Sequence, residues 1–222
     1  MAGGRDERQP GAGPWYGIKW IVGGLGLLVV GFPLLAGGFG DVEAGRRKAE
    51  VCAPCHGADG NSTTPEVPSL AGQPPLYTYY QLLLFQQQQR VSAQMAPVVA
   101  SLSRQDMQDL AAYYAVQTPA VPPPPRDPAK AEVGRRLVKA HYCDSCHAPG
   151  LVGQKHIPRL AGQHYAYLVT QLRAYKTQQR TDLDGTMTIV AQPLSNEEIE
   201  ALAEYLASLP AGAGLPRPHT AR

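Results

Sequence analysis

Charge is scarce in this sequence. Only 17% of its 222 residues are Asp, Glu, Lys or Arg, and the formal net charge at pH 7 is +2. Proteins that bind nucleic acid usually carry a strong positive field, because attraction to phosphate supplies much of their affinity. We therefore expect no nucleic-acid partner for this chain.

Strand patterns and phenylalanine are also scarce. The chain has three Phe, 23 Gly and 21 Pro, which indicates many loops but stays below the level typical of disordered chains. Two segments show the i, i+3, i+4, i+7 spacing of an apolar helix face, and each follows the Ser-x-x-acid pattern of a helix start. The apolar positions are Met107, Leu110, Ala111 and Tyr114 in the first segment, and Ile199, Leu202, Ala203 and Leu206 in the second. These features predict an all-α fold.

Cysteine is limited to four residues, and all four belong to two C-x-x-C-H sequences. On a helical turn, positions i and i+3 face the same way, so both thiols of a pair can reach one flat group while the histidine points at its centre. This spacing is typical of c-type haem, which takes two thioether bonds from the protein and one histidine on its iron. The sequence therefore predicts two covalent haem c groups, attached at Cys52 and Cys55 with His56, and at Cys143 and Cys146 with His147.

Three other interpretations of the cysteines stay open. Four thiolates could hold zinc, each pair could be redox-active, or the pairs could be structural disulfides of an exported protein. The two pairs lie far apart in the sequence, each is followed by the same histidine, and no βαβ pattern surrounds them. The sequence therefore favours haem.

The two C-x-x-C-H sequences belong to an internal repeat. The sequence PSLAGQ at 68–73 returns as PRLAGQ at 158–163, and the helical stretch 77–90 aligns with 167–180. This alignment indicates that the chain consists of two copies of one module. We predict a first domain at 41–117, a Pro-rich extended linker at 118–128, a second domain at 129–212 and a tail at 213–222.

Each iron needs a sixth ligand or an open site. Methionine opposite histidine is a pair found in c-type electron carriers. Met95 and Met187 occupy equivalent places in the two repeats, in sequence that we expect to form loops, whereas Met107 lies on an apolar helix face and is expected in the core. We predict Met95 opposite His56 and Met187 opposite His147, which leaves no open site and favours electron transfer over catalysis.

The first 40 residues differ from the rest. An apolar run at 18–39 follows Arg5 and Arg8, and it is long enough to cross a bilayer. A secretory signal usually has a shorter apolar core. We predict that residues 1–40 form a retained anchor in the inner membrane; a cleaved signal peptide, which would leave a soluble periplasmic protein, and a buried helix are the alternatives. Under the first two, the remainder of the chain is exported to the periplasm.

Taken together, these residues resemble the dihaem cytochrome c4 family. The resemblance covers about 41–210 and rests on CAPCHGADGNS at 52–62, the two Pro-x-Leu-Ala-Gly-Gln segments, the two Gln-Leu helices and the Met-then-Leu-Ser pattern. It implies two tandem class I cytochrome c domains, in which the carbonyls of Pro68 and Pro158 accept hydrogen bonds from the ligand histidines. One departure is CHAPG at 146–150, where the family usually continues as a Gly-containing loop.

The resemblance also implies a function. Members carry electrons in the periplasm, typically to a haem-copper terminal oxidase, here from a cytochrome bc-type complex or another donor, with no small-molecule substrate. An electron-accepting subunit of a periplasmic dehydrogenase is the alternative, and a dihaem enzyme such as a peroxidase would need one displaceable iron ligand. Residues 41–125 have a net charge of −2 and residues 126–222 of +3, so the two domains could dock different partners.

Overall fold

The computed structural model describes residues 38–212. In this part of the chain there are helices and turns but no strand, and a single isolated bridge pairs Gln154 with Ile157. The all-α prediction is therefore confirmed for the described residues. The anchor or signal predicted at 1–40 lies almost wholly outside them, as does the tail at 213–222. Between residues 38 and 212, no helix combines the length and the apolar character needed to cross a membrane.

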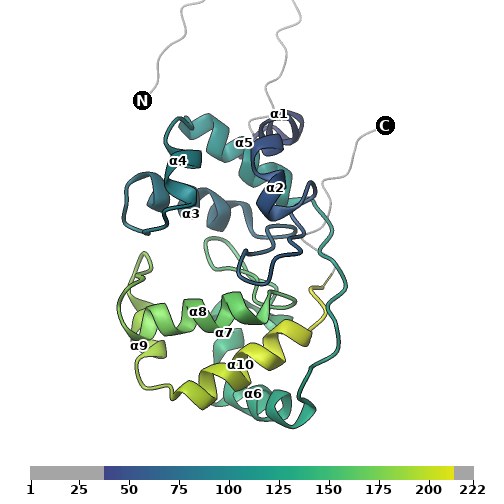
Figure 1. Ribbon diagram of the computed structural model, residues 1–222, viewed down its shortest axis with the longest axis vertical. Coiled ribbons are helices and arrows are strands. Elements are labelled where there is room, and N and C mark those ends of the chain that lie inside the picture. Colours follow the sequence, from purple (N-terminus) through teal and green to yellow (C-terminus); the bar gives the residue numbers. More distant parts are fainter. Residues whose placement is uncertain (1–37, 213–222) are drawn as a thin grey trace, which may run out of the picture. The chain divides into compact units, whose positions relative to one another are not determined.

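The first domain is built on two crossed helices near its ends, α1 and α5, with α3 packed against α5 (Figure 1). Short helices carry the residues between them. The elements are α1 (Val42–Lys48), the 3₁₀ turn η1 (Ala49–Val51), α2 (Ala53–His56), α3 (Pro75–Gln86), α4 (Met95–Val99) and α5 (Arg104–Ala115).

The second domain repeats this order, with α6 crossing α10 and α8 packed against α10. Its elements are α6 (Pro128–Ala140), α7 (Cys143–His147), the 3₁₀ turn η2 (Pro149–Leu151), α8 (Tyr165–Lys176), α9 (Thr186–Ala191) and α10 (Asn196–Ser208). The internal repeat of the sequence is thus a repeat of helices. The added 3₁₀ turn after α7 is a local difference, at the place where CHAPG departs from the first copy.

Capping boxes start the last helix of each domain. Ser103 accepts a hydrogen bond from the backbone N–H of Asp106, whose carboxylate accepts one from the Ser103 backbone. Ser195 and Glu198 make the same exchange. Each box satisfies N–H groups that have no partner within the helix. The Ser-x-x-acid prediction is therefore confirmed at both sites.

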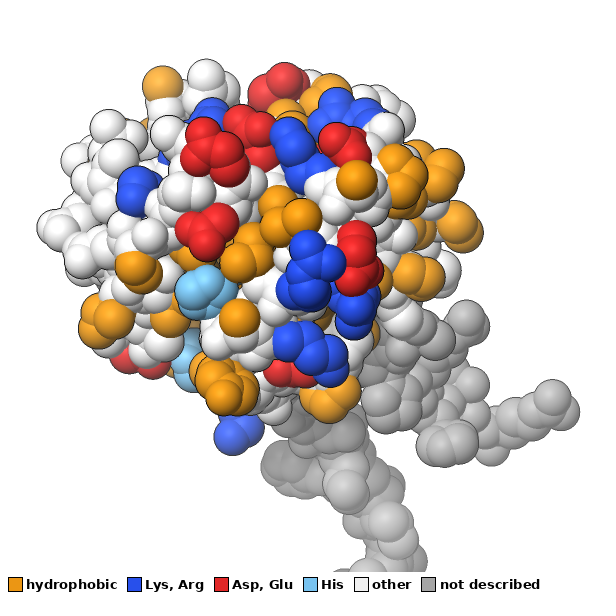
Figure 2. All heavy atoms as spheres, turned by 90° about the horizontal axis from the view of Figure 1, so that it is seen from below, with side chains coloured by type: hydrophobic (Ala, Val, Ile, Leu, Met, Phe, Trp, Pro, Cys, Tyr) orange, Lys and Arg blue, Asp and Glu red, His pale blue; other side chains and the backbone are white. Residues whose placement is uncertain are grey.

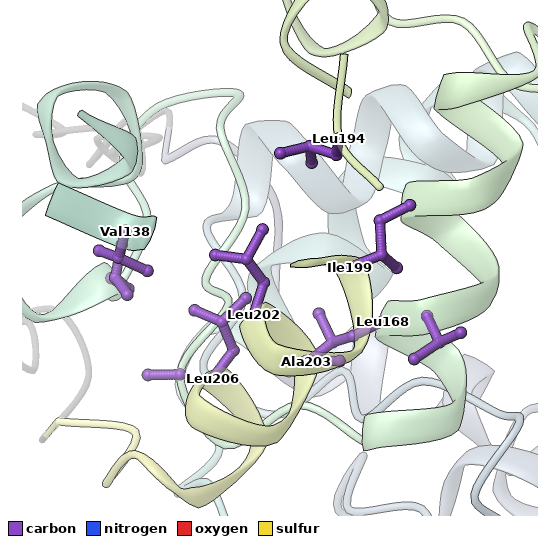
Figure 3. Close-up of a cluster of buried hydrophobic side chains, with 10 residues drawn as sticks. Val138, Leu168, Leu194, Ile199, Leu202, Ala203 and Leu206 are labelled. Atoms are coloured by element: carbon purple, nitrogen blue, oxygen red, sulfur yellow. The ribbon is translucent and has the colours of Figure 1, made fainter. Parts of the chain in front are cut away.

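The predicted apolar faces form the core. In the second domain Leu202 and Leu206 of α10 pack with Leu168 of α8 and with Val138 of α6 (Figure 3). In the first domain the side chain of Met107 is fully buried (0% exposed). The prediction that Met107 is a core residue is confirmed, which leaves two described methionines for other roles.

Glycine allows the terminal helices of each domain to touch. Gly45 of α1 faces the backbone of α5 so closely that an added Cβ would overlap the carbonyl oxygen of Asp109. Gly134 of α6 stands in the same relation to the carbonyl oxygen of Ala201 on α10. Only a residue without a side chain fits at these crossings, so the distance between the helix axes depends on the two glycines.

Residues 118–127 connect the domains without helix or strand, and side chains of both domains hold them. Near the start, Asn61 donates to the carbonyl of Thr118 (3.0 Å) and accepts from the backbone N–H of Ala120 (2.8 Å). Near the end, the buried carboxylate of Glu204 accepts from the backbone N–H groups of Arg126 and Asp127. The segment is therefore held at both ends.

Candidate cofactor-binding sites

The first C-x-x-C-H sequence folds as one tight turn. Cys52 precedes α2, and its carbonyl accepts hydrogen bonds from the backbone N–H groups of Cys55 (3.2 Å) and His56 (2.9 Å). These bonds hold the two cysteines one turn apart on the same side. Cys52 is half-buried and Cys55 is exposed.

The second sequence folds in nearly the same way. Cys143 begins α7 and is half-buried, whereas Cys146 is exposed. Ala148 then takes a positive φ of 66°, where the first copy has Gly57 at 79°. The backbone therefore leaves both helices in a similar conformation, although CHAPG replaces the glycine with a residue that rarely adopts it.

Burial disfavours the thiolate form of Cys52 and Cys143, the more buried cysteine of each pair. It raises the pKa of Cys52, and it raises the pKa of Cys143 to about 11. Redox-active cysteines show the opposite shift, because the thiolate is the nucleophile. Among residues 38–212 the four cysteines are free, and no three His, Cys, Asp or Glu side chains gather as a metal site would require. The raised pKa values of Cys52 and Cys143 therefore do not fit a nucleophilic role for these two thiols.

The two histidines are buried and oriented alike. His56 is 8% exposed and His147 is 4% exposed. Nδ1 of His56 lies 2.9 Å from the carbonyl oxygen of Pro68, and Nδ1 of His147 lies 2.9 Å from that of Pro158. A nitrogen that faces a carbonyl oxygen must carry the proton, so Nε2 keeps its lone pair.

Burial also lowers the pKa of both histidines, although the bonds to Pro68 and Pro158 oppose this shift. The neutral imidazole is the form that binds a metal. Each site therefore offers a fixed, neutral Nε2 next to two thiols on one helical turn. This donor set fits haem c.

The prediction that Met95 and Met187 lie in loops is wrong. Met95 begins α4 and Met187 lies in the first turn of α9, so neither belongs to a loop. Polar side chains just before each helix hold its first turn: Ser92 Oγ accepts from the Met95 backbone N–H (3.2 Å), and Asp182 accepts from that of Met187 (2.9 Å). Both methionines are half-buried. Their role as iron ligands stays a prediction.

The residues that join the two domains were not foreseen from the sequence. Arg90 donates to the hydroxyl of Tyr167 (2.8 Å), and Arg180 donates to the hydroxyl of Tyr77 (3.3 Å). Burial raises the pKa of Tyr167, but the positive charges of Arg90 and Arg180 outweigh this effect, so the pKa falls below its usual value. The available signal was that these Tyr and Arg residues align in the repeat.

The glutamines that end the two Pro-x-Leu-Ala-Gly-Gln segments are a second set of missed residues. Gln73 is 3% exposed and Gln163 is 4% exposed. Each bonds the backbone of the other domain, directly after the proline that accepts the histidine. These contacts connect the two candidate sites.

Comparison with known proteins identifies the architecture. The family model for cytochrome c matches residues 42–115 and 131–210. Cytochrome c4 of Stutzerimonas stutzeri is 38% identical over 203 residues, which cover 82% of this chain and 96% of that protein. The crystal structure of reduced recombinant cytochrome c4 from Pseudomonas stutzeri matches with a TM-score of 0.72 at 38% identity, over 77% of this chain and 99% of that chain.

A relative with a different name is also similar. The thiosulfate dehydrogenase electron acceptor of Thiomonas intermedia (strain K12) is 34% identical over 174 residues, which cover 73% of this chain and 80% of that protein.

Proposed function

Because the chain belongs to the cytochrome c4 family and carries two covalently bound haem c groups, we propose that it transfers single electrons in the periplasm. Each haem supplies one-electron exchange at its iron, and the protein sets its potential and its access to partners. The observation that carries this proposal is the pair of equivalent turns in which a buried histidine donates through Nδ1 to a prolyl carbonyl.

We propose the following roles for the residues of these sites. The cysteines form the thioether bonds, and each histidine binds the iron through Nε2. The prolyl carbonyls hold the imidazole rings in orientation, which also raises the basicity of the ligand nitrogen. The methionines would be the second protein ligands of the irons and would favour the reduced state. The first site comprises Cys52, Cys55, His56, Pro68 and Met95, and the second comprises Cys143, Cys146, His147, Pro158 and Met187.

The proposed partners are redox proteins rather than small molecules. Electrons would come from a cytochrome bc-type complex or another donor and pass to a haem-copper terminal oxidase. With two protein ligands on each iron, the protein would act as a carrier and not as an enzyme. Residues 1–40 would tether it to the inner membrane, or would be removed as a signal to leave it soluble, and a tether would raise its concentration near membrane-bound partners.

A second candidate function is suggested by the similarity to a thiosulfate dehydrogenase electron acceptor. In this role the protein would be the electron-accepting subunit of a periplasmic dehydrogenase. The two functions differ in assembly, because a subunit stays bound to its catalytic partner. Co-purification of a dehydrogenase with the native protein at a constant ratio would favour the second function.

The intact mass of the protein made with haem-c maturation tests the proposal first. We expect a mass equal to the polypeptide plus two haems, and no binding of carbon monoxide or cyanide to the resting protein, because a histidine and a methionine would both bind each iron. A full-length polypeptide would support the tether, and loss of the N-terminal segment would support release. A polypeptide with no covalent haem would contradict the proposed function, and ligand binding at one iron would favour an enzyme.

Charge differs between the two domains, and this difference supports distinct docking surfaces. Residues 41–125 have five basic and seven acidic side chains, and residues 126–212 have ten basic and nine acidic. Several cations of the second domain are paired, such as Lys130 and Arg173 with Glu200. On one face Lys and Arg alternate with Asp, Glu and apolar side chains (Figure 2). The electrostatic contribution to docking should therefore be modest.

Stopped-flow reaction with an anionic reagent, hexacyanoferrate(III), measures this contribution. We expect the oxidation rate of the first haem to rise more steeply with ionic strength than that of the second, because the first domain is more negative and salt screens its repulsion of the anionic reagent. Equal salt dependence at the two haems would contradict separate electrostatic docking and would leave apolar contacts as the basis of recognition.

A further inference from the structure

Two buried glutamines cross between the domains. Gln73 of the first domain accepts a hydrogen bond from the backbone N–H of Arg159 (3.0 Å) and donates to the Arg159 carbonyl (3.0 Å). Gln163 of the second domain accepts from the backbone N–H of Ser69 (2.9 Å) and donates to the Ser69 carbonyl (2.9 Å). The same amide pairing thus occurs twice, in opposite directions.

The backbone N–H that each glutamine contacts belongs to the peptide group whose carbonyl accepts the histidine. The carbonyl of Pro158 and the N–H of Arg159 are two ends of one peptide unit. That carbonyl accepts from Nδ1 of His147 (2.9 Å). A continuous series of hydrogen bonds, called here a hydrogen-bond chain, therefore runs from Gln73 Oε1, through the peptide between Pro158 and Arg159, to the imidazole of His147.

A second, equivalent series of hydrogen bonds runs in the opposite direction, from the second domain to the first. Gln163 Oε1 accepts from the N–H of Ser69, and the same peptide unit offers the carbonyl of Pro68 to Nδ1 of His56. The glutamines and the histidines are all buried. Water therefore competes little for these bonds, and the local dielectric constant is low.

Hydrogen bonds in such a chain strengthen one another. When the N–H of a peptide donates, its carbonyl oxygen gains negative charge and becomes a better acceptor, by about 10–30% per bond. A stronger bond at Nδ1 gives the imidazole more anionic character and makes Nε2 a more basic ligand. A more basic ligand stabilises the oxidised iron, which lowers the reduction potential.

We propose that Gln73 is a positioning residue for the iron of the second domain, and that Gln163 is one for the iron of the first. Each domain thereby tunes the potential of the other through a buried hydrogen-bond chain. This inference rests on the proposed function, because it requires His56 and His147 to be iron ligands. Through these bonds each glutamine is connected to the ligand histidine of the other domain, and not to that of its own domain.

A purely structural role for the glutamines predicts a different result. Other bonds also join the domains, including the one from Arg90 to the hydroxyl of Tyr167 and the one from Arg159 to the carbonyl of Ala71 (2.8 Å). The bond from Arg90 involves no atom of the two prolyl peptides. If the glutamines only hold the domains together, loss of this bond should have the same effect on the potentials.

The test replaces each glutamine with methionine, which has a similar size and no amide, in the intact two-haem protein. Redox titration followed by NMR assigns each potential, because each haem is attached to the two cysteines of its own domain. We expect Q73M to raise the potential of the second haem and Q163M to raise that of the first. The expected size is about threefold to tenfold in the ratio of reduced to oxidised iron at a fixed potential, and tenfold corresponds to about 59 mV.

Two control variants separate the explanations. Tyr167→Phe removes a bond between the domains, and Gln86→Met removes a half-buried amide that bonds the carbonyls of Val99 and Leu102 within the first domain. Neither should shift the potentials in the crossed pattern. The inference would be overturned if a glutamine variant shifted neither potential, or shifted only the potential of the haem in its own domain. It would also be overturned if Tyr167→Phe produced the same crossed shift.

A second readout does not depend on the potential. In the reduced protein, the Nδ1 proton of His147 should move to higher field in Q73M, while that of His56 should stay in place. If Q73M does not fold, Gln73→Asn removes the same bond with a shorter amide and should give the same result. If the variants keep covalent haem with His/Met ligation and neither readout changes, this inference alone is overturned. If the unmutated protein lacks His/Met ligation, the proposed function is contradicted.

Discussion

Replacing Met187 with histidine should lower the reduction potential of the second haem by on the order of 0.2 V, a fraction of the roughly 0.8 V that axial ligands span. A thioether sulfur favours the reduced iron, whereas a second imidazole favours the oxidised iron. Met187 lies in the first turn of α9, where the carboxylate of Asp182 fixes its backbone. Spectroelectrochemical titration of the intact protein would measure both potentials.

Met107 provides the matched control for this substitution. It is the methionine of α5 that is fully buried in the core, so Met107→Leu should leave both potentials unchanged and cost less than about 1.5 kcal/mol of stability. The ligand assignment would be wrong if Met187→His left the potential of the second haem in place, or if Met107→Leu produced a comparable fall.

Replacing Gly134 with alanine should destabilise the second domain by roughly 3 kcal/mol or more, at the upper end of the cost of overpacking. The added methyl group would overlap the carbonyl oxygen of Ala201, which belongs to a helix backbone and cannot rotate away. The crossing of α6 and α10 would have to open. Denaturant unfolding and the yield of covalently attached second haem would report the effect.

Gly185 is a useful comparison. Nothing lies within 4 Å of an added Cβ there, although its φ of 75° is unfavourable for alanine. Gly185→Ala should therefore cost only about 1 kcal/mol, the conformational strain alone. Equal losses in the two variants would mean that steric overlap at the helix crossing is not what Gly134 relieves.

Features that depend on local sequence were predictable. The C-x-x-C-H spacing, the Ser-x-x-acid helix starts and the apolar faces of α5 and α10 each involve residues within about two helical turns, and the repeat made each pattern visible twice. The capping box at Ser103 and the burial of Met107 followed directly from such patterns.

Other features depend on distant residues or on competing local bonds. Gln73 and Arg159 are 86 residues apart, and their contact exists only because the two domains dock. A repeated glutamine was visible, but nothing in one copy shows that its partner is the other copy. The helical positions of Met95 and Met187 were missed because Ser92 and Asp182, which hold the first turns, were not recognised as helix starts.

The reciprocal pairing of Gln73 and Gln163 has a consequence for symmetry. Each domain presents both halves of the contact: an amide that reaches out, and a prolyl peptide that receives the amide of its neighbour. This is the self-complementary arrangement of an isologous interface, in which one patch pairs with a copy of itself. The two domains therefore relate to each other as the subunits of a homodimer do, and residues 118–127 make that pairing intramolecular.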